Sequence, residues 1–354
     1  MWKPPYLGPT DFPSVLATIA GRATYHDRTT NWPADDLTAL AAAGAMRWSI
    51  PSEFGGDPLS PLDLHLRYEQ LAAACLASAL IFTQRDAAVG LIAAAEGASP
   101  RDRLLTRLAK NEIWATVGIA QLTTSRQGAK PALLAVRENK GYRLNGFIPW
   151  CTGGHQSQFI VAGAHLEDGK QILFVLQQHQ QGVEWDPPMQ LVALTCTLTS
   201  GIHLKNVLIE DQWLLRGPAD AVLGNRHTSL TLGQCFTAMG LCRAAIDLIG
   251  KHTAATAQAA HDRFNQQLEE IRKEVIALCA PGREQQAAQS NARLRAACND
   301  LALRTTHAAV SIYKGSALLL DHPAQRLARE ALFLLVWSCP VPVIECTVEM
   351  LTEQ

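Results

Sequence analysis

The sequence lacks the features that mark several classes of protein. Its nine cysteines form no C-x-x-C pair, and no grouping of cysteine and histidine has zinc-site spacing, so no metal site is expected. An odd number of cysteines without a pattern favours a reducing cytoplasm over secretion. The N-terminal segment "MWKPPYLGPTDFP" is rich in proline and has no apolar core of the kind that signal peptides carry.

Charge and long hydrophobic runs are also scarce. Charged residues make up 18% of the chain and the formal net charge is −1, which gives no general attraction to nucleic acid or to an anionic membrane. The longest apolar run, Ala331 to Trp337, is too short to span a bilayer. What the chain does have is 48% hydrophobic residues over 354 positions, enough for two or three packed units.

Residues 34–110 have helical patterns. Two segments, "SPLDLHLRYEQLAAACLASALIF" and "SPRDRLLTRLAKN", open with Ser-Pro-x-Asp, which combines an N-cap serine, an N1 proline and an acid in the first turn. The segment "ADDLTALAAAG" ends at Gly44, a glycine placed to stop a helix. We therefore predict an N-terminal helical domain over residues 1–111.

The pattern changes to strands between about Ile113 and Leu215. Short segments such as "QFIVAGAHL" and "QILFVL" are separated by Gly, Asp and Pro, and "EDGK" between these two favours a hairpin turn. From about Thr228 the pattern is helical again and long enough for a bundle. The predicted fold is α+β, mostly α, with a middle antiparallel β-domain over residues 112–218 and a C-terminal four-helix bundle over residues 219–354.

The run "GYRLNGFIPWCTGG" contains a tryptophan and a threonine two apart, ahead of two glycines. Side chains two apart on a strand point to the same face, so Trp150 and Thr152 would line one wall together. The indole would supply packing and the hydroxyl one hydrogen bond. Taken alone, Trp150 is more often a core aromatic at a strand end.

Five motifs in chain order resemble those of the acyl-CoA dehydrogenase superfamily. They are the P-x-E-x-G-G turn in "IPSEFGG", the strand end "GIAQLTT", the G-x-x-x-N-G…W-x-T-x-G pattern in "GYRLNGFIPWCTGG", "NVLI" near the end of the β-domain, and "HPAQRLARE" in the last helix. The resemblance covers nearly the whole chain and keeps the family's domain order. It implies an acyl-CoA dehydrogenase-like flavoprotein.

The resemblance also implies which residues hold the flavin. In such proteins the tryptophan packs on the flavin ring and the threonine hydrogen-bonds the ring near N5, roles that carry over to Trp150 and Thr152. Leu122 and Thr123 would present backbone and hydroxyl groups to the pyrimidine edge, although a threonine of high β-propensity is the ordinary interpretation of Thr123. Protein dipoles placed at the flavin atoms N5 and O4 suit this cofactor, because reduction of the flavin builds negative charge at these atoms.

Two departures from the family pattern concern the cofactor. In "TTSRQGAK" Thr124 stands where the family has an acid, and Ser125, Arg126 and Gly128 are the available substitutes for phosphate contacts. In "AAHDRFNQQLEEI" Arg263 lacks the nearby glycine of the stretch that helps bind the adenine half of FAD in the partner subunit, so a solvated helix-face charge is the favoured interpretation. FAD is the expected cofactor, with FMN as the alternative.

The third departure concerns the catalytic base. Desaturation of an acyl-CoA needs a carboxylate that takes the α-proton while hydride leaves the β-carbon for flavin N5. The family supplies it from a Tyr-Glu-Gly-Thr loop after the last arginine-bearing helix, or from an acid early in the first bundle helix. Here those stretches read "WSCPVPV" and "RHTSLTLGQ", without an acid. Asp220 precedes the helix and Glu345 comes several residues late, so the catalytic residue is unknown.

Other candidates have ordinary structural interpretations. Cys339 and His155 are weak candidates for catalysis, and Cys339 has no histidine adjacent in sequence to activate it. His322 is expected in the N-terminal cap of the last helix. Arg326 and Arg329 lie three apart on one helix face and are expected to pair with carboxylates within the bundle.

Three functions are consistent with these residues. The first is a cytoplasmic flavin oxidoreductase of the acyl-CoA dehydrogenase type, which acts on acyl-CoA or a similar small molecule and passes electrons to an electron-transfer flavoprotein. The second is a reduced-flavin monooxygenase of the dibenzothiophene type, supplied by a flavin reductase; such proteins also lack the glutamate base. The third is a non-catalytic member of the fold. The resemblance implies a homodimer or homotetramer.

Overall fold

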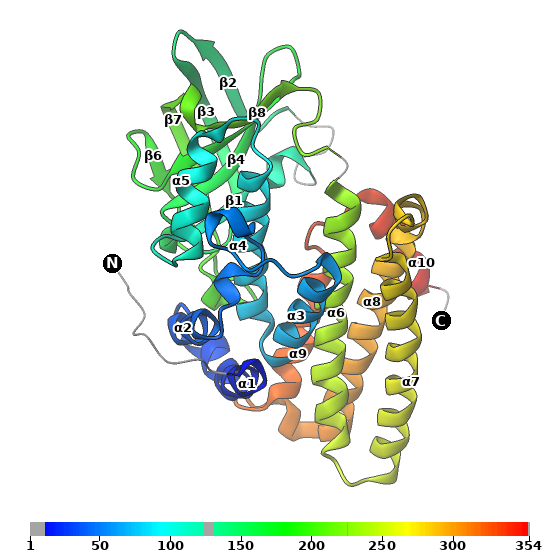
Figure 1. Ribbon diagram of the computed structural model, residues 1–354. Coiled ribbons are helices and arrows are strands. Elements are labelled where there is room, and N and C mark those ends of the chain that lie inside the picture. Colours follow the sequence, from blue (N-terminus) through cyan, green and yellow to red (C-terminus); the bar gives the residue numbers. More distant parts are fainter. Residues whose placement is uncertain (1–10, 124–129, 225, 353–354) are drawn as a thin grey trace.

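The computed structural model describes residues 11–123, 130–224 and 226–352. Figure 1 shows the strands gathered at one end of the molecule and the long helices α6, α7 and α8 running side by side along another part of it, with α3 beside α6. Thr124, Ser125, Arg126 and Gly128, the residues considered for phosphate contacts, lie outside the described residues.

The N-terminal region is helical, as predicted. Its helices are α1 (Phe12–Thr29), α2 (Ala34–Ala42), α3 (Pro61–Ala74), α4 (Leu76–Ala93) and α5 (Ala98–Ala109). Ser60 caps α3, since its side chain accepts a hydrogen bond from the Asp63 backbone nitrogen at 3.1 Å. Ser99 has extended backbone angles at the start of α5, and Gly44 follows α2 with a φ of +79°. The signals at Ser60 and Gly44 are therefore confirmed, whereas α5 has Gly97 at its N-cap and no side-chain capping hydrogen bond, so a capping role for Ser99 stays a prediction.

The middle region forms one eight-stranded sheet. Its strands are β1 (Ala115–Gly118), β2 (Leu133–Glu138), β3 (Gly141–Cys151), β4 (Phe159–His165), β5 (Gln171–Gln177), β6 (Val183–Trp185), β7 (Ser200–Glu210) and β8 (Leu214–Ala219). The order is β6-β7-β3-β2-β4-β5-β8, with β1 paired to β4. The predicted hairpin joins β4 to β5, where the Leu166 nitrogen bonds the Lys170 carbonyl oxygen at 2.8 Å.

The prediction of a purely antiparallel sheet is wrong in one respect. Both β1 and β2 run parallel to β4, whereas the remaining pairs are antiparallel. A parallel pair needs a long crossover connection. The β2–β3 hairpin supplies that length between β1 and β4, and pattern alone does not show which strand returns beside which.

The C-terminal region contains three long helices and two short ones. They are α6 (Arg226–Gly250), α7 (Ala255–Leu278), α8 (Glu284–Tyr313), α9 (Pro323–Leu334) and α10 (Val341–Thr352). Helix α8 packs against α6, α7, α9 and α10, and α3 packs against α6. One hydrophobic core therefore runs from α1–α4 through the turn before β7 into α6–α9.

Helix α4 lies between this core and a second one, which it shares with α5 and strands β1, β4 and β5. Its Leu76–Ala93 span, and Leu232–Gly250 within α6, are long and apolar enough to cross a membrane. However, 72% of each window is buried inside the protein, as in the core helices of soluble proteins. These two helices are weak evidence for a membrane span.

Candidate functional site

The W-x-T-G-G stretch ends β3 and turns beneath two other tryptophans. Trp150 is 47% exposed, whereas Cys151 is fully buried and Thr152 is half-buried. Strand β3 ends at Cys151, so Thr152 lies in the turn that follows the strand, and a shared face for Trp150 and Thr152 stays a prediction. The indole of Trp150 therefore lies at the surface of this chain, and its neighbour in sequence anchors the strand in the core.

Two indoles cover the glycines of this turn. A Cβ atom on Gly153, whose φ is +64°, would lie 2.7 Å from the Trp32 ring, and one on Gly154 would lie 2.4 Å from the Trp185 ring. Real Cβ atoms do not approach ring carbons so closely. The two glycines are therefore required by the tryptophans that pack over the turn.

A chain of three hydroxyl groups leads inward from Thr152. Its Oγ1 lies 3.2 Å from Thr199 Oγ1, which lies 2.9 Å from Thr197 Oγ1. Thr197 is fully buried and Thr199 is 6% exposed. The Thr116 hydroxyl donates to the Thr152 carbonyl oxygen at 2.8 Å. Sequence analysis did not single out Thr197 or Thr199, although the alternating threonines of "TCTLT" were the available signal.

The turn that carries Thr197 has a strained backbone. Residues Thr195–Thr197 form a short 3₁₀ helix, and Leu194 and Leu198 on either side of it have φ values of +62° and +48°. A residue other than glycine in this left-handed region costs about 1–3 kcal/mol. Such strain persists only where the surrounding structure enforces it, and it is concentrated at functional sites.

Leu122 and Thr123 follow β1 in another short 3₁₀ turn, which packs against β3 and β4. The Leu122 side chain points into the sheet, because its Cδ1 would lie 2.2 Å from a Cβ atom on Gly163. The Thr123 hydroxyl donates to the Ala120 carbonyl oxygen at 3.3 Å. The Gln121 amide ties this turn to the Gly163 carbonyl oxygen at 2.9 Å. The backbone of Leu122, and not its side chain, therefore faces away from the sheet.

The two weak catalytic candidates are both engaged in structural contacts. Cys339 is 8% exposed and its Sγ donates to the Leu334 carbonyl oxygen at 3.5 Å. Burial raises the pKa of the Cys339 thiol, although Arg295 opposes the shift. The His155 ring packs on Trp185 at 4.8 Å, and its Nε2 hydrogen-bonds the Asp186 carbonyl oxygen at 3.0 Å. A catalytic role stays a prediction for both.

Three acids among the described residues bear on the question of a catalytic base. Asp220 and Glu345 are exposed. Glu330, an acid of α9 that sequence analysis did not consider, is 2% exposed and bound by Arg326 at 2.8 Å. Burial raises the pKa of this carboxyl and Arg326 opposes the shift. Because Arg326 occupies both carboxylate oxygens, Glu330 is committed to an ion pair.

The other basic residues of α9 and α7 mostly follow their sequence-based interpretation. The His322 side chain caps α9 by accepting from the Ala324 nitrogen at 3.2 Å, and Arg263 is exposed. Arg329 pairs with Asp27 at 3.0 Å. Its partner belongs to α1 and not to the bundle, so that expectation is wrong for Arg329, because the packing of α9 against α1 was not readable from helical periodicity.

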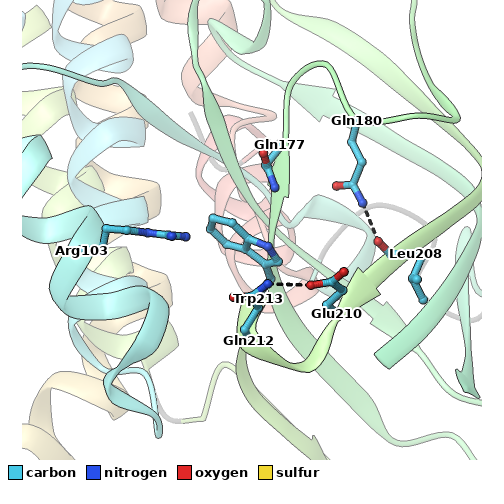
Figure 2. Close-up of a pocket in the computed structure, with 7 residues that line it drawn as sticks. All are labelled: Arg103, Gln177, Gln180, Leu208, Glu210, Gln212 and Trp213. Atoms are coloured by element: carbon cyan, nitrogen blue, oxygen red, sulfur yellow. Dashed lines mark hydrogen bonds between the residues drawn. The ribbon is translucent and has the colours of Figure 1, made fainter. Parts of the chain in front are cut away.

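A polar hollow of about 280 Å³ lies elsewhere on the sheet, and Figure 2 shows the side chains that line it. The Arg103 side chain extends from α5 toward the Trp213 ring, with the guanidinium carbon 4.9 Å from the ring centroid. Residues near the ends of β5 and β7 complete the lining: Gln177, Gln180, Leu208, Glu210 and Gln212. Neither Trp150 nor Thr152 borders this hollow, so it is separate from the W-x-T-G-G turn.

Comparison with known proteins places this geometry in context. Residues 15–112 match the family described as "Acyl-CoA dehydrogenase, N-terminal domain". A curated relative, 3-sulfinopropanoyl-CoA desulfinase of Paraburkholderia xenovorans, is 24% identical over 343 residues, which are 90% of this chain and 87% of the relative.

Solved structures share the fold over almost the whole chain. Butyryl-CoA dehydrogenase from Megasphaera elsdenii superposes with a TM-score of 0.82 at 17% identity, covering 98% of this chain and 99% of the other. FMN-bound TdsC, the dibenzothiophene monooxygenase of Paenibacillus sp. A11-2, superposes with a TM-score of 0.83 at 13% identity, covering 96% of each chain. One architecture therefore accommodates both chemistries that the sequence left open.

Proposed function

The chain is a divergent member of the acyl-CoA dehydrogenase superfamily, and from this premise we propose that it is a flavin-dependent oxidoreductase acting on an acyl thioester. A bound flavin would supply a hydride acceptor at N5. Trp150 and Thr152 would hold the ring, and the backbone of Leu122 with Thr123 would meet its pyrimidine edge. The acyl-CoA named in the desulfinase relative supports a thioester as the substrate class.

The half-exposed indole beside an anchored hydroxyl is the observation that carries this proposal. A large aromatic side chain left 47% uncovered offers a flat surface for a planar ring. Thr152 follows two residues later, and its carbonyl oxygen and hydroxyl are both held by buried threonines. The residues present therefore fit a flavin ring, with FAD as the expected form and the FMN of TdsC as the precedent for the alternative.

A reduced-flavin monooxygenase is the second candidate, and one observation favours it. The loop from Leu335 to Pro340 has no carboxylate, and Arg326 sequesters Glu330, the nearest acid of α9 in sequence. Proton abstraction from a thioester α-carbon needs a base within hydrogen-bond reach, whereas the oxygen chemistry that a reduced flavin would supply does not. The TdsC fold supports the same alternative.

Absorption spectroscopy separates the candidates. We expect purified protein to bind FAD or FMN, and an acyl-CoA to bleach the flavin band under anaerobic conditions if it is a dehydrogenase. Consumption of oxygen by protein supplied with reduced flavin, without anaerobic bleaching, would support the monooxygenase. Failure to bind flavin in either redox state would reject both.

The redox partner protein depends on which of these two functions the chain has. A dehydrogenase would pass electrons to an electron-transfer flavoprotein, whereas a monooxygenase would draw reduced flavin from a reductase. We also propose a homodimer or homotetramer, by analogy with the superfamily. Sedimentation velocity on the full chain, with and without flavin, measures this directly.

A further inference from the structure

We propose that Thr197 and Thr199 fix the direction of the Thr152 hydroxyl, so that Thr152 presents a proton, and not a lone pair, to the flavin side of the turn. This inference rests on the proposed function for its consequence but not for its geometry. Thr197 and Thr199 act as positioning residues, since Thr152 is the only one of these three threonines that would meet the cofactor.

The three threonine hydroxyl groups form a short chain of hydrogen bonds that ends at the buried residue Thr197. Thr197 Oγ1 hydrogen-bonds Thr199 Oγ1 at 2.9 Å, and Thr199 Oγ1 hydrogen-bonds Thr152 Oγ1 at 3.2 Å. Thr197 is fully buried. Among the described residues, Thr199 is the only hydrogen-bond partner found for the Thr197 hydroxyl.

Counting protons along the chain gives its direction. Each hydroxyl has one proton to donate, and a buried proton without an acceptor is costly. The Thr197 proton must therefore go to Thr199. Thr199, whose oxygen accepts that proton, then donates its own to Thr152. The Thr152 oxygen is thus an acceptor within the chain, and its proton points away from Thr199.

The backbone around the chain prevents the three residues from rearranging. The Thr116 hydroxyl holds the Thr152 carbonyl oxygen at 2.8 Å, and the Gly153 nitrogen donates to the Thr197 carbonyl oxygen at 2.9 Å. The left-handed residues Leu194 and Leu198 fix the turn that carries Thr197. Leu194 is 3% exposed and packs in the main hydrophobic core, so the same core that enforces the strained turn also holds these hydroxyls in place.

The direction matters because flavin N5 changes its hydrogen-bonding role. In oxidised flavin N5 is an acceptor, whereas in reduced flavin it carries a hydrogen and is a donor. A proton directed outward from Thr152 matches the oxidised form, and accepting from Thr199 strengthens the Thr152 hydroxyl as a donor; to meet the reduced form, the hydroxyl would have to turn this proton aside and present its remaining lone pair. The chain therefore favours oxidised flavin, and breaking it at Thr199 frees the Thr152 hydroxyl to accept from reduced flavin.

The first test compares the midpoint potential of bound flavin in wild-type, Thr199→Val and Thr199→Ser proteins. We expect Thr199→Val to change the ratio of affinities for reduced and oxidised flavin about tenfold toward the reduced form, which for a two-electron couple is a rise of about 30 mV. Thr199→Ser keeps the hydroxyl and should keep the wild-type potential. Thr305→Val, which removes a buried hydroxyl bonded to helix carbonyls of α8, is the distant control.

The inference is overturned if Thr199→Val binds flavin at the wild-type potential, or if Thr199→Ser shifts the potential equally. Neutron diffraction from deuterium-exchanged crystals of the flavin-free protein tests the geometry separately. We expect the Thr197 deuteron on the bond to Thr199 and the Thr199 deuteron on the bond to Thr152; the opposite order would reject the inference. If wild-type protein binds no flavin, the proposed function fails, while the neutron result still decides the direction.

Discussion

At the scale of single residues, the turn after β3 depends on two glycines, which have no side chain. Trp32 and Trp185 pack over Gly153 and Gly154, where a methyl group would overlap ring atoms. Sequence patterns of the superfamily predicted glycine here without the reason for it. The reason is that two indoles from distant parts of the chain must cross the turn that holds Thr152.

Replacing Gly154 by alanine should therefore disturb both stability and cofactor binding. The added Cβ would lie 2.4 Å from Trp185 and 2.8 Å from the Cys151 sulfur, and such overpacking costs about 1–3 kcal/mol. We expect a lower urea midpoint and weaker flavin binding by fluorescence titration. Gly21→Ala is the matched control, because nothing lies within 4 Å of that Cβ in α1 and the change should stabilise the protein by about 0.4–1 kcal/mol.

His65 makes stability depend on pH. It stacks on Phe236 at 5.3 Å, and burial lowers its pKa to about 4. The unfolded chain therefore binds more protons than the folded one between about pH 6.5 and pH 4, so the free energy of unfolding falls as pH falls through this window. We expect a loss of about 2 kcal/mol between pH 7 and pH 5 from this group alone.

Urea unfolding of wild-type and His65→Gln proteins at the two pH values measures this contribution. Glutamine does not titrate, so the variant should lose less stability than wild type between pH 7 and pH 5. An identical loss in both proteins would show that other groups carry the pH dependence.

At the scale of secondary-structure elements, α9 is bound to α1 and to the turn before β7. Arg329 pairs with Asp27, whose side chain is 7% exposed, and it also donates to the Val192 carbonyl oxygen at 2.7 Å. One arginine thus joins an N-terminal helix, a β-domain turn and a C-terminal helix. The Leu194–Leu198 segment that carries Thr197 begins two residues after this contact.

Arg329→Gln should loosen that junction. Asp27 would keep a largely buried carboxylate without its main partner, which costs about 1–3 kcal/mol for a partly exposed pair. We expect a lower urea midpoint and faster amide exchange in both α1 and α9. Arg263→Gln, at an exposed position in α7, should stay within about 0.5 kcal/mol of wild type. Exchange unchanged in α1 would contradict the proposed coupling.

At the scale of the whole molecule, the N-terminal helices and the bundle share one hydrophobic core. The ion pair of Glu69 in α3 with Arg272 in α7, at 2.9 Å, crosses between them. Unfolding of either set of helices would expose the apolar surface that the other set buries. We therefore expect the two sets to unfold together. Thermal unfolding should show one main transition for these two regions.

Flavin should raise the temperature of that transition. A ligand present at 100 times its dissociation constant stabilises the folded state by about 2.7 kcal/mol, so FAD or FMN should shift the melting temperature by several degrees. Trp150→Ala should lose the shift with little change in the ligand-free protein, because the indole is 47% exposed. Trp150→Phe should retain part of it. An equal shift in the alanine variant would place the flavin elsewhere.

The sequence by itself determined the order and kind of the elements. Ser60 and Gly44 mark helix ends, and "EDGK" marks a hairpin, through interactions within a few residues. Local signals of this kind are readable because both partners are close in the chain. The motif around Trp150 and Thr152 was readable for the same reason.

Only the tertiary structure decided what those elements meet. The parallel pairing of β1 with β4, the ion pair of Arg329 with Asp27, and the hydroxyl chain from Thr152 to Thr197 all join residues more than 40 positions apart. Such contacts depend on how buried surfaces pack in three dimensions, which no local periodicity encodes. The strained leucines at 194 and 198 belong with them, because only the surrounding fold can hold an unfavourable backbone in place.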